Sequence, residues 1–141
     1  MGVRSEMEKD PFILDIVTLK KVVFSEEIQS LTAPGNEGYF GILAGHTPFV
    51  SSLQVGVVKI TKANGELLTL ATSGGFLMTN GKKVILLADT AERPEEIDVA
   101  RAQAAKERAE KRLAERAQDI DIDRVKAALF RAINRLKVAG R

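Results

Sequence analysis

Residues 54–88 read QVGVVKITKANGELLTLATSGGFLMTNGKKVILLA and carry the clearest structural signals in the chain. Turn residues separate short aliphatic and β-branched runs here, namely Gln54–Thr61, Leu67–Thr72, Phe76–Thr79 and Lys83–Ala88. The pairs Asn64-Gly65 and Asn80-Gly81 are strong hairpin signals, because Asn and Gly accept the positive φ angles of tight turns. This stretch therefore predicts short strands joined by tight turns.

The same pattern extends towards the N-terminus, where Phe12–Thr18, Ile28–Thr32 and Phe40–Leu43 are further candidate strands. Many short strands with close turns predict a β-sandwich or barrel-like sandwich of about 80 residues. We assign it to residues 11–93, after an N-terminal extension at 1–10. Ser73-Gly74-Gly75 is a candidate anion cradle of backbone N–H groups. We favour the other interpretation, in which these glycines bring one strand close to another backbone or turn a barrel corner.

Composition changes sharply at Pro94, because ten of the eleven glycines lie before it and eleven alanines lie after it. Two apolar stripes at helical spacing follow, one formed by Ala102, Ala105, Ala109 and Leu113 and the other by Ile122, Val125, Leu129, Ile133 and Leu136. The link at residues 118–121 is short and polar, which favours an antiparallel hairpin. We expect an α+β protein in which this hairpin, residues 94–141, enters at Pro94 and ends at Gly140.

Length and composition exclude several functional classes. The 141 residues contain no Cys and a single His, so thiol chemistry and multi-histidine metal centres are excluded. We expect no metal, no secretion signal and no direct membrane insertion, since the longest aliphatic run is far shorter than the roughly 20 residues of a membrane span. A net charge of +2 is too small to indicate nucleic acid as the main partner.

Familiar catalytic motifs are absent from the sequence: there is no GxxxxGK[ST], GxSxG or HExxH, so an enzyme acting alone is not expected. His46 is a candidate general base, but a lone loop histidine more often serves a turn or packing. From Arg124 to Arg141 there are six basic residues and no acidic one. This cationic arm is either a solvated helix face or a surface for an acidic partner or a phosphate.

Three motifs, taken in order, resemble one known family. Gly41–Pro48 reads GILAGHTP, Ser73–Phe76 reads SGGF, and Ile97–Ala102 reads IDVARA. They resemble the GILPGHAP loop, the SGGF strand and the [IL]DxxRA motif of the epsilon subunit of F-type ATP synthases. The resemblance extends over roughly residues 11–139. It departs from the family at Ala44, where proline is usual, and at Tyr39, where some members carry an acidic residue thought to face the membrane ring.

The resemblance implies a non-catalytic subunit of the rotary central stalk, peripheral to the cytoplasmic face of the cell membrane. The sandwich would bind the gamma subunit and the c-ring. The hairpin would lie folded on the sandwich, or extend to the catalytic beta (and alpha) subunits and inhibit ATP hydrolysis. The inhibitory basic face would consist of Arg124, Lys126, Arg131 and Arg135.

Some members of this family also bind ATP in the folded hairpin, as a regulatory ligand rather than a cofactor. The matching positions are Glu92, Ile97, Asp98, Arg101, Ala102, Arg108, Arg131 and Arg135. Arginine spacings of seven and four place cations along one face of each helix, so a closed hairpin would bring both sets to one polyphosphate. Asp98 or Glu92 would then accept hydrogen bonds from the base or ribose.

Other interpretations of these residues stay open at the sequence level. Asp98 with Arg101, and Glu107 with Lys111, are equally spaced for ordinary pairing within one helix. The main functional alternative is a free-standing ATP-sensing module without a rotor partner. A basic hairpin that binds anions or nucleic acid is a more distant alternative.

Overall fold

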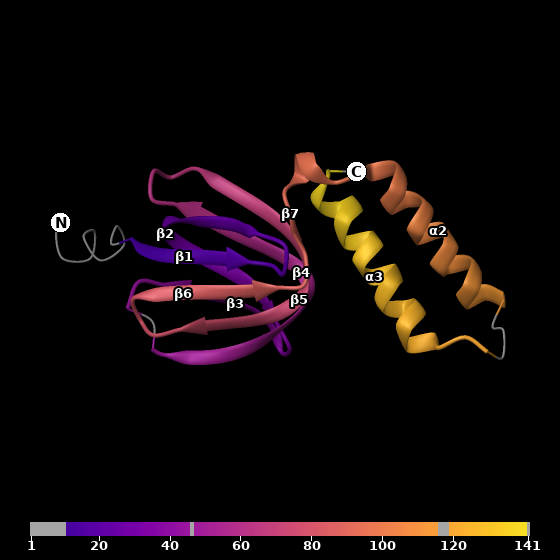
Figure 1. Ribbon diagram of the computed structural model, residues 1–141, viewed down its shortest axis with the longest axis horizontal. Coiled ribbons are helices and arrows are strands. Elements are labelled where there is room, and N and C mark those ends of the chain that lie inside the picture. The colour runs from indigo at the N-terminus through magenta and orange to yellow at the C-terminus, as the bar shows by residue number, and fades with distance from the viewer. Residues whose placement is uncertain (1–10, 46, 116–118, 141) are drawn as a thin grey trace.

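The computed structural model describes residues 11–45, 47–115 and 119–140, and places a β-sandwich before a pair of helices (Figure 1). The expectations for residues 1–10, His46 and Gln118 lie outside the described residues. The strands are β1 (Phe12–Val17), β2 (Val22–Gly35), β3 (Gly38–Leu43), β4 (Phe49–Lys62), β5 (Leu67–Thr79), β6 (Lys83–Ala88) and β7 (Ala91–Glu92).

The strands form one seven-stranded sheet in the order β1-β6-β5-β4-β2-β3, with β7 added on β5. β1 also pairs with β2, so the sheet closes on itself. The β1–β6 pairing is parallel and the other pairings are antiparallel. The predicted α+β fold, a β-sandwich followed by two helices, is therefore confirmed.

Both predicted Asn-Gly hairpin turns are present. Gly65 has φ +90°, and the Lys62 N–H donates to the Glu66 carbonyl at 2.8 Å across that turn. Gly81 has φ +94° in the turn between β5 and β6, where the Asn80 side chain accepts the N–H groups of Lys82 and Lys83. Asn therefore supplies the turn acceptor and Gly supplies the positive φ.

The separation of Leu67–Thr72 from Phe76–Thr79 was wrong, because both belong to the continuous strand β5. Gly75 has φ +140°, and a Cβ atom there would lie 1.9 Å from the Leu87 carbonyl oxygen. The glycines therefore allow a close approach between β5 and β6, as the favoured interpretation predicted. β2 and β4 are also longer than predicted, and β7 had no strand signal in the sequence.

The sandwich core consists of aliphatic side chains from facing strands. Leu14 and Ile16 of β1 are fully buried, whereas Ile13, the residue just before Leu14, is 43% exposed. β6 alternates in the same way. Side chains of β2, β4, β5 and β6 complete the core, with full or nearly full burial of Ile28, Leu31, Ile60, Leu70, Leu77, Val84 and Leu86. Period-two alternation is the signature of a strand with one face on a core.

After β7 the chain forms a short 3₁₀ turn, η1 (Pro94–Glu96), and then the helices α2 (Val99–Glu115) and α3 (Ile122–Val138). Pro94 therefore begins η1, and not the first long helix as predicted. That helix, α2, begins after Asp98, whose carboxylate accepts the Arg101 N–H and caps it. α3 lies between the sandwich and α2, and contacts β4 and β5 (Figure 1).

The seam between α2 and α3 differs from the predicted stripe. Ala102 and Ala109 of α2 are buried, together with Val125 and Ala132 of α3. The predicted seam residues Ile122 and Ile133 are instead 48% and 42% exposed. Small side chains allow the helices to approach closely, so Ile133 is displaced to a rim that it shares with Gln103 and Lys106.

Candidate functional site

A groove of about 240 Å³ runs between α2 and α3. Four arginines line it, namely Arg108, Arg112, Arg124 and Arg131, with Asp121 and a floor of Ala105, Ala109, Val125 and Ala128. The Asp121 carboxylate accepts the Arg124 N–H at 3.2 Å and caps α3, so it is already engaged. The groove is therefore strongly cationic, and guanidinium groups are well shaped for phosphate.

Helical spacing explains this concentration of charge. Arg108 and Arg112 are one turn apart on α2, and Arg124 and Arg131 are two turns apart on α3. The predicted convergence of Arg108 and Arg131 is thus present in the folded hairpin. Arg101 lies two turns before Arg108, exposed in the first turn of α2 and outside the lining of the groove.

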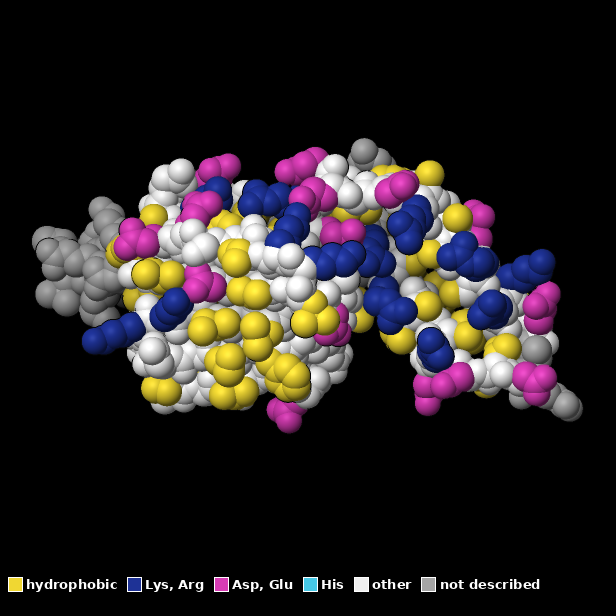
Figure 2. Space-filling model, viewed as in Figure 1, with side chains coloured by type: hydrophobic (Ala, Val, Ile, Leu, Met, Phe, Trp, Pro, Cys, Tyr) yellow, Lys and Arg dark blue, Asp and Glu magenta, His cyan; other side chains and the backbone are white. Residues whose placement is uncertain are grey.

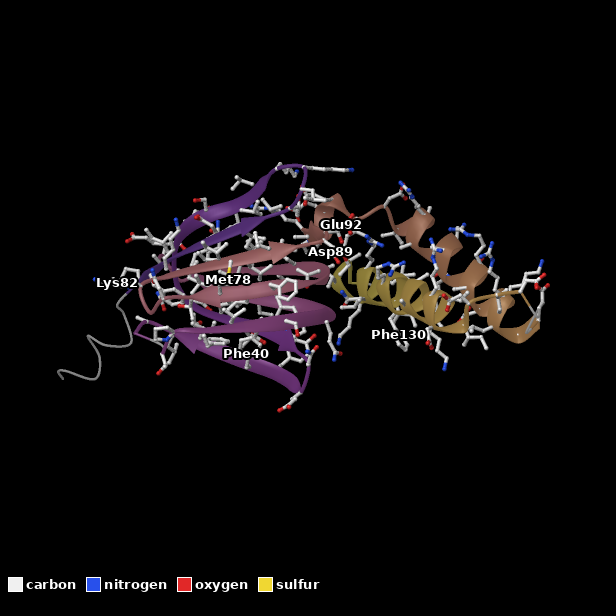
Figure 3. The ribbon with its side chains drawn as sticks, turned by 60° about the horizontal axis from the view of Figure 1, so that its bottom comes forward. Phe40, Met78, Lys82, Asp89, Glu92 and Phe130 are labelled. Atoms are coloured by element: carbon white, nitrogen blue, oxygen red, sulfur yellow. The ribbon has the colours of Figure 1, made fainter. Side chains whose placement is uncertain are left out.

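A second group of predicted residues meets where α3 touches the sandwich. The Arg135 Nε donates to the Glu92 Oε1 at 2.5 Å, which joins the end of β7 to α3. Arg131 lies beside this pair, in a small recess that also contains Thr72 and Ser73. Figure 3 shows Glu92 at the junction of sandwich and hairpin. Arg135 must therefore give up its hydrogen bond to the Glu92 carboxylate in order to bind a phosphate.

The remaining predicted residues lie at the base of the hairpin. Ile97 and Ala102 are buried, with 7% and 4% exposure. Asp98 uses its Oδ1 to accept the Arg101 N–H at 3.0 Å, which is a helix cap rather than a side-chain ion pair. Glu107 accepts from the Gln103 side chain at 3.0 Å. Both acids proposed for pairing within a helix thus have other bonding partners.

The predicted basic face is only partly a single face. Arg124, Arg131 and Arg135 share one side of α3, because seven and eleven residues are close to whole numbers of turns. Lys126 is two residues from Arg124, about 200° around the helix, so it lies on the opposite side. Arg131 and Arg135 are half-buried in the folded hairpin, whereas Arg124 and Lys126 are exposed.

Sequence reasoning missed two residues of this region. Arg112 lines the groove, and its four-residue spacing from Arg108 was a usable signal. Asn134 donates its side-chain N–H to the Gly56 carbonyl oxygen at 2.7 Å, across the junction with the sandwich. An isolated Asn inside an amphipathic helix gave no indication of that contact.

The sandwich has a cluster of outward-facing apolar side chains that we call the outer apolar face, formed by Val50, Phe76, Met78, Ile85 and Leu87. Phe76 pairs with Leu87, and Met78 pairs with both Ile85 and Val50. Val50, Phe76 and Leu87 are 68%, 54% and 42% exposed. Figure 2 shows hydrophobic side chains gathered on this side of the sandwich. A continuous exposed apolar surface is typical of an interaction site.

An ion pair of Asp15 and Lys83 borders the outer apolar face, where Asp15 is the strand partner of Ile85. The Ser25 hydroxyl donates to Asp15 Oδ1 at 2.6 Å, and Lys83 Nζ lies 3.0 Å from Asp15 Oδ2. These two contacts, the Ser25 hydrogen bond first, lower the pKa of Asp15 below its ordinary value of 3.8. The carboxylate is therefore charged at neutral pH and fixed between β1, β2 and β6.

Two further features concern the described part of the chain. No group of three or more His, Cys, Asp or Glu residues is placed to hold a metal ion there. None of its helices combines the length and the apolar character required to cross a bilayer.

Comparison with known proteins gives consistent matches over both parts of the chain. The family described as ATP synthase, Delta/Epsilon chain, matches through its beta-sandwich domain at residues 11–94 and its long alpha-helix domain at 95–140. The ATP synthase epsilon chain of Pelotomaculum thermopropionicum is 54% identical over 128 residues, which cover 91% of this chain and 95% of that one. That of Desulforamulus reducens is 50% identical over 126 residues, with 89% and 95% covered.

Solved structures agree. A chain of the Euglena gracilis mitochondrial ATP synthase, in an assembly of OSCP, F1 and c-ring, superposes with a TM-score of 0.77 at 26% identity. The match covers 93% of this chain and 82% of that chain. A chain of the Tetrahymena thermophila central stalk and c-ring has a TM-score of 0.57 at 17% identity, a likeness of fold alone. From motifs, architecture and relatives together, the chain belongs to the delta/epsilon chain family of ATP synthases.

Proposed function

We propose that this chain is the epsilon subunit in the central stalk of an ATP synthase, where it performs no catalysis and regulates the complex. In this proposal its hairpin binds ATP when folded, and inhibits ATP hydrolysis when extended. The observation that carries the proposal is the cationic groove, because Arg108 and Arg131 come together only while α2 and α3 are folded on each other.

The triphosphate is the part of ATP that this groove suits. Two helices contribute guanidinium groups, and bidentate hydrogen bonds from Arg to phosphate replace the backbone cradle of a phosphate loop. Ile97 and Ala102 lie at the base of the hairpin, but they are only 7% and 4% exposed, so the adenosine end would reach them only after neighbouring side chains move. ATP bound there would span from the base of the hairpin to the groove.

Binding to the folded state alone would shift the conformational equilibrium. At free ATP of about 100 times the dissociation constant the shift amounts to about 2.7 kcal/mol. Among the described residues, α2 and α3 bury only four apolar side chains in their seam, three of them alanines, so a shift of this size is large by comparison. Abundant ATP would therefore hold the inhibitory hairpin retracted.

The outer apolar face supports a partner on the sandwich, which we assign to the gamma subunit. Its exposed Phe76, Leu87 and Val50 would be covered in such a complex. The c-ring would contact another part of the sandwich, and the extended hairpin would reach the beta and alpha subunits. The location would be peripheral, on the cytoplasmic face of the cell membrane.

A free-standing ATP-sensing module is the alternative, and it does not explain this exposed surface. Copurification distinguishes the two functions. A rotor subunit forms a stoichiometric complex with gamma, whereas a free-standing module binds ATP and leaves gamma in the unbound fraction.

Titration of ATP into the isolated full-length chain tests the nucleotide site. Replacement of Arg131 by Ala removes a charge-assisted phosphate contact worth roughly 1.5–3 kcal/mol, so affinity should fall by about ten-fold or more. Arg101→Ala should have a smaller effect, since Arg101 lies outside the groove. Lys111→Ala is the matched control for loss of an exposed cation on α2. Equal affinities for Arg131→Ala and this control would exclude the groove as the phosphate site.

A further inference from the structure

One uncharged polar side chain, that of Asn134, hydrogen-bonds the hairpin to the sandwich. Asn134 of α3 directs its amide nitrogen at two backbone carbonyl oxygens, Gly56 O at 2.7 Å and Thr72 O at 3.4 Å. Gly56 on β4 and Thr72 on β5 are direct partners in the sheet. A single amide group therefore ties α3 to both strands that it packs against.

The Gly56 acceptor is held rigidly by its surroundings. A Cβ atom on Gly56 would lie 2.6 Å from Cβ of Pro34 and 2.7 Å from the Tyr39 hydroxyl oxygen, so only glycine fits. The pairing of β2 with β4 shifts register between Thr32 and Gly35. Close to this irregularity, the Val57 N–H donates to the Tyr39 hydroxyl at 2.9 Å. Tyr39 thus fixes the backbone next to the carbonyl that Asn134 reaches.

When the Asn134 side chain leaves, the Gly56 carbonyl oxygen still accepts a hydrogen bond from another residue, Thr72. The Thr72 hydroxyl donates to the same oxygen at 3.3 Å, and Thr72 is only 2% exposed. A carbonyl oxygen has two lone pairs, so it accepts Asn134 and Thr72 together and retains Thr72 when the helix leaves. The undocked sandwich therefore avoids the free-energy cost of an unsatisfied buried acceptor at this position.

We propose that Asn134 is the positioning residue that holds the hairpin docked on the sandwich in the absence of nucleotide. The Glu92–Arg135 pair lies next to it, but those two side chains are 31% and 29% exposed, and a partly exposed ion pair adds little. The proposal deepens the regulatory function proposed above, because the docked population sets how often the hairpin is free to extend.

The test measures docking in the isolated full-length chain without ATP or partner subunits. The chain contains no cysteine, so cysteines introduced at Glu66 and Glu110 carry a unique pair of spin labels. Glu66 lies in the exposed turn between β4 and β5, and Glu110 on the exposed side of α2. Their distance distribution reports the ratio of docked to undocked hairpin.

Asn134→Ala removes the donor, and Asn134→Asp replaces it with a carboxylate of the same shape that faces two acceptors. We expect the ratio of docked to undocked molecules to fall by about ten-fold in Asn134→Ala, and further in Asn134→Asp. Melting of the sandwich should remain cooperative in both. Lys111→Gln gives the same charge change as Asn134→Asp on an exposed part of α2, and should leave the distribution unchanged.

Two results would overturn the proposal. One is a wild-type distance distribution in both Asn134 variants. The other is a shift in Asn134→Asp alone, which would reveal repulsion by the new carboxylate rather than loss of a contact. Because the measurement uses neither nucleotide nor gamma, its failure would leave the proposed ATP site and stalk function untouched, and failure of the ATP titration would leave this result untouched.

Discussion

The sandwich and the hairpin bury side chains of very different size. Leu14, Ile28, Leu70 and Leu86 in the sandwich are completely buried, and large aliphatic residues surround them. Among the described residues, those buried in α2 and α3 are Ala102, Ala109 and Ala132, with Val125 as the largest. A buried leucine side chain contributes about 1.5–3 kcal/mol, whereas an alanine methyl contributes about 0.8 kcal/mol.

This difference in buried side chains makes the sandwich the stable part of the molecule and the hairpin the part that can undock. The sandwich closes its sheet through the β1–β2 pairing and has its own core. The hairpin depends on a small seam and on polar contacts at Asn134 and Arg135. Contacts of this kind are easily exchanged for water or for another partner, so the hairpin is the part suited to change its position.

The largest expected effect is a cavity in the sandwich core. Leu14→Ala should destabilise the protein by about 2–5 kcal/mol, because Leu14 is completely buried and the rigid sheet cannot collapse around the lost atoms. Urea unfolding followed by circular dichroism measures this loss. Retention of wild-type stability would contradict the view that this core carries the fold.

Removal of residues 94–141 should have a smaller effect. The isolated sandwich loses its contact with Asn134, about 0.5–1.5 kcal/mol, and its contact with Arg135, about 0–1 kcal/mol, and should still melt cooperatively. It should also retain gamma binding, which Phe76→Asp on the outer apolar face should abolish. Broad melting of the fragment would show that the sandwich needs the hairpin.

The smallest effect concerns the charge of Asp15. Its pKa is lowered in the folded state, so its contribution to stability is complete above the unfolded value of 3.8 and is lost as pH falls through the lower folded value. Asp15→Asn should therefore be less stable than wild type at neutral pH, and the difference should shrink progressively as pH falls below 3.8. A difference between the two proteins that stays constant with pH would exclude this charge as the cause.

The elements that sequence reasoning predicted well are those set by local chemistry. Asn64-Gly65 and Asn80-Gly81 form turns wherever they stand between strands, and the alanine-rich stripes form helices. The continuity of β5 through Gly74 and Gly75 was missed because glycine usually interrupts a strand. Here it is required by the nearby Leu87 carbonyl, a contact that depends on the fold as a whole.

The candidate site was predicted only in part for the same reason. Helical spacing was enough to bring Arg108 and Arg131 together. The Glu92–Arg135 pair, in contrast, joins residues 43 positions apart in the sequence, and Asn134 bonds a carbonyl 78 positions away. No local pattern encodes contacts of that range, because the docking angle of the hairpin decides them.

The equal length of α2 and α3 determines how far this chain can reach. Each has 17 residues, which at 1.5 Å per residue gives about 25 Å. Folded together they occupy one such length beside the sandwich. Placed end to end they span about 50 Å, more than twice the roughly 20 Å of a six-residue strand such as β6. Opening the hairpin would let a 15.4 kDa protein touch a surface far from the place where its sandwich is fixed.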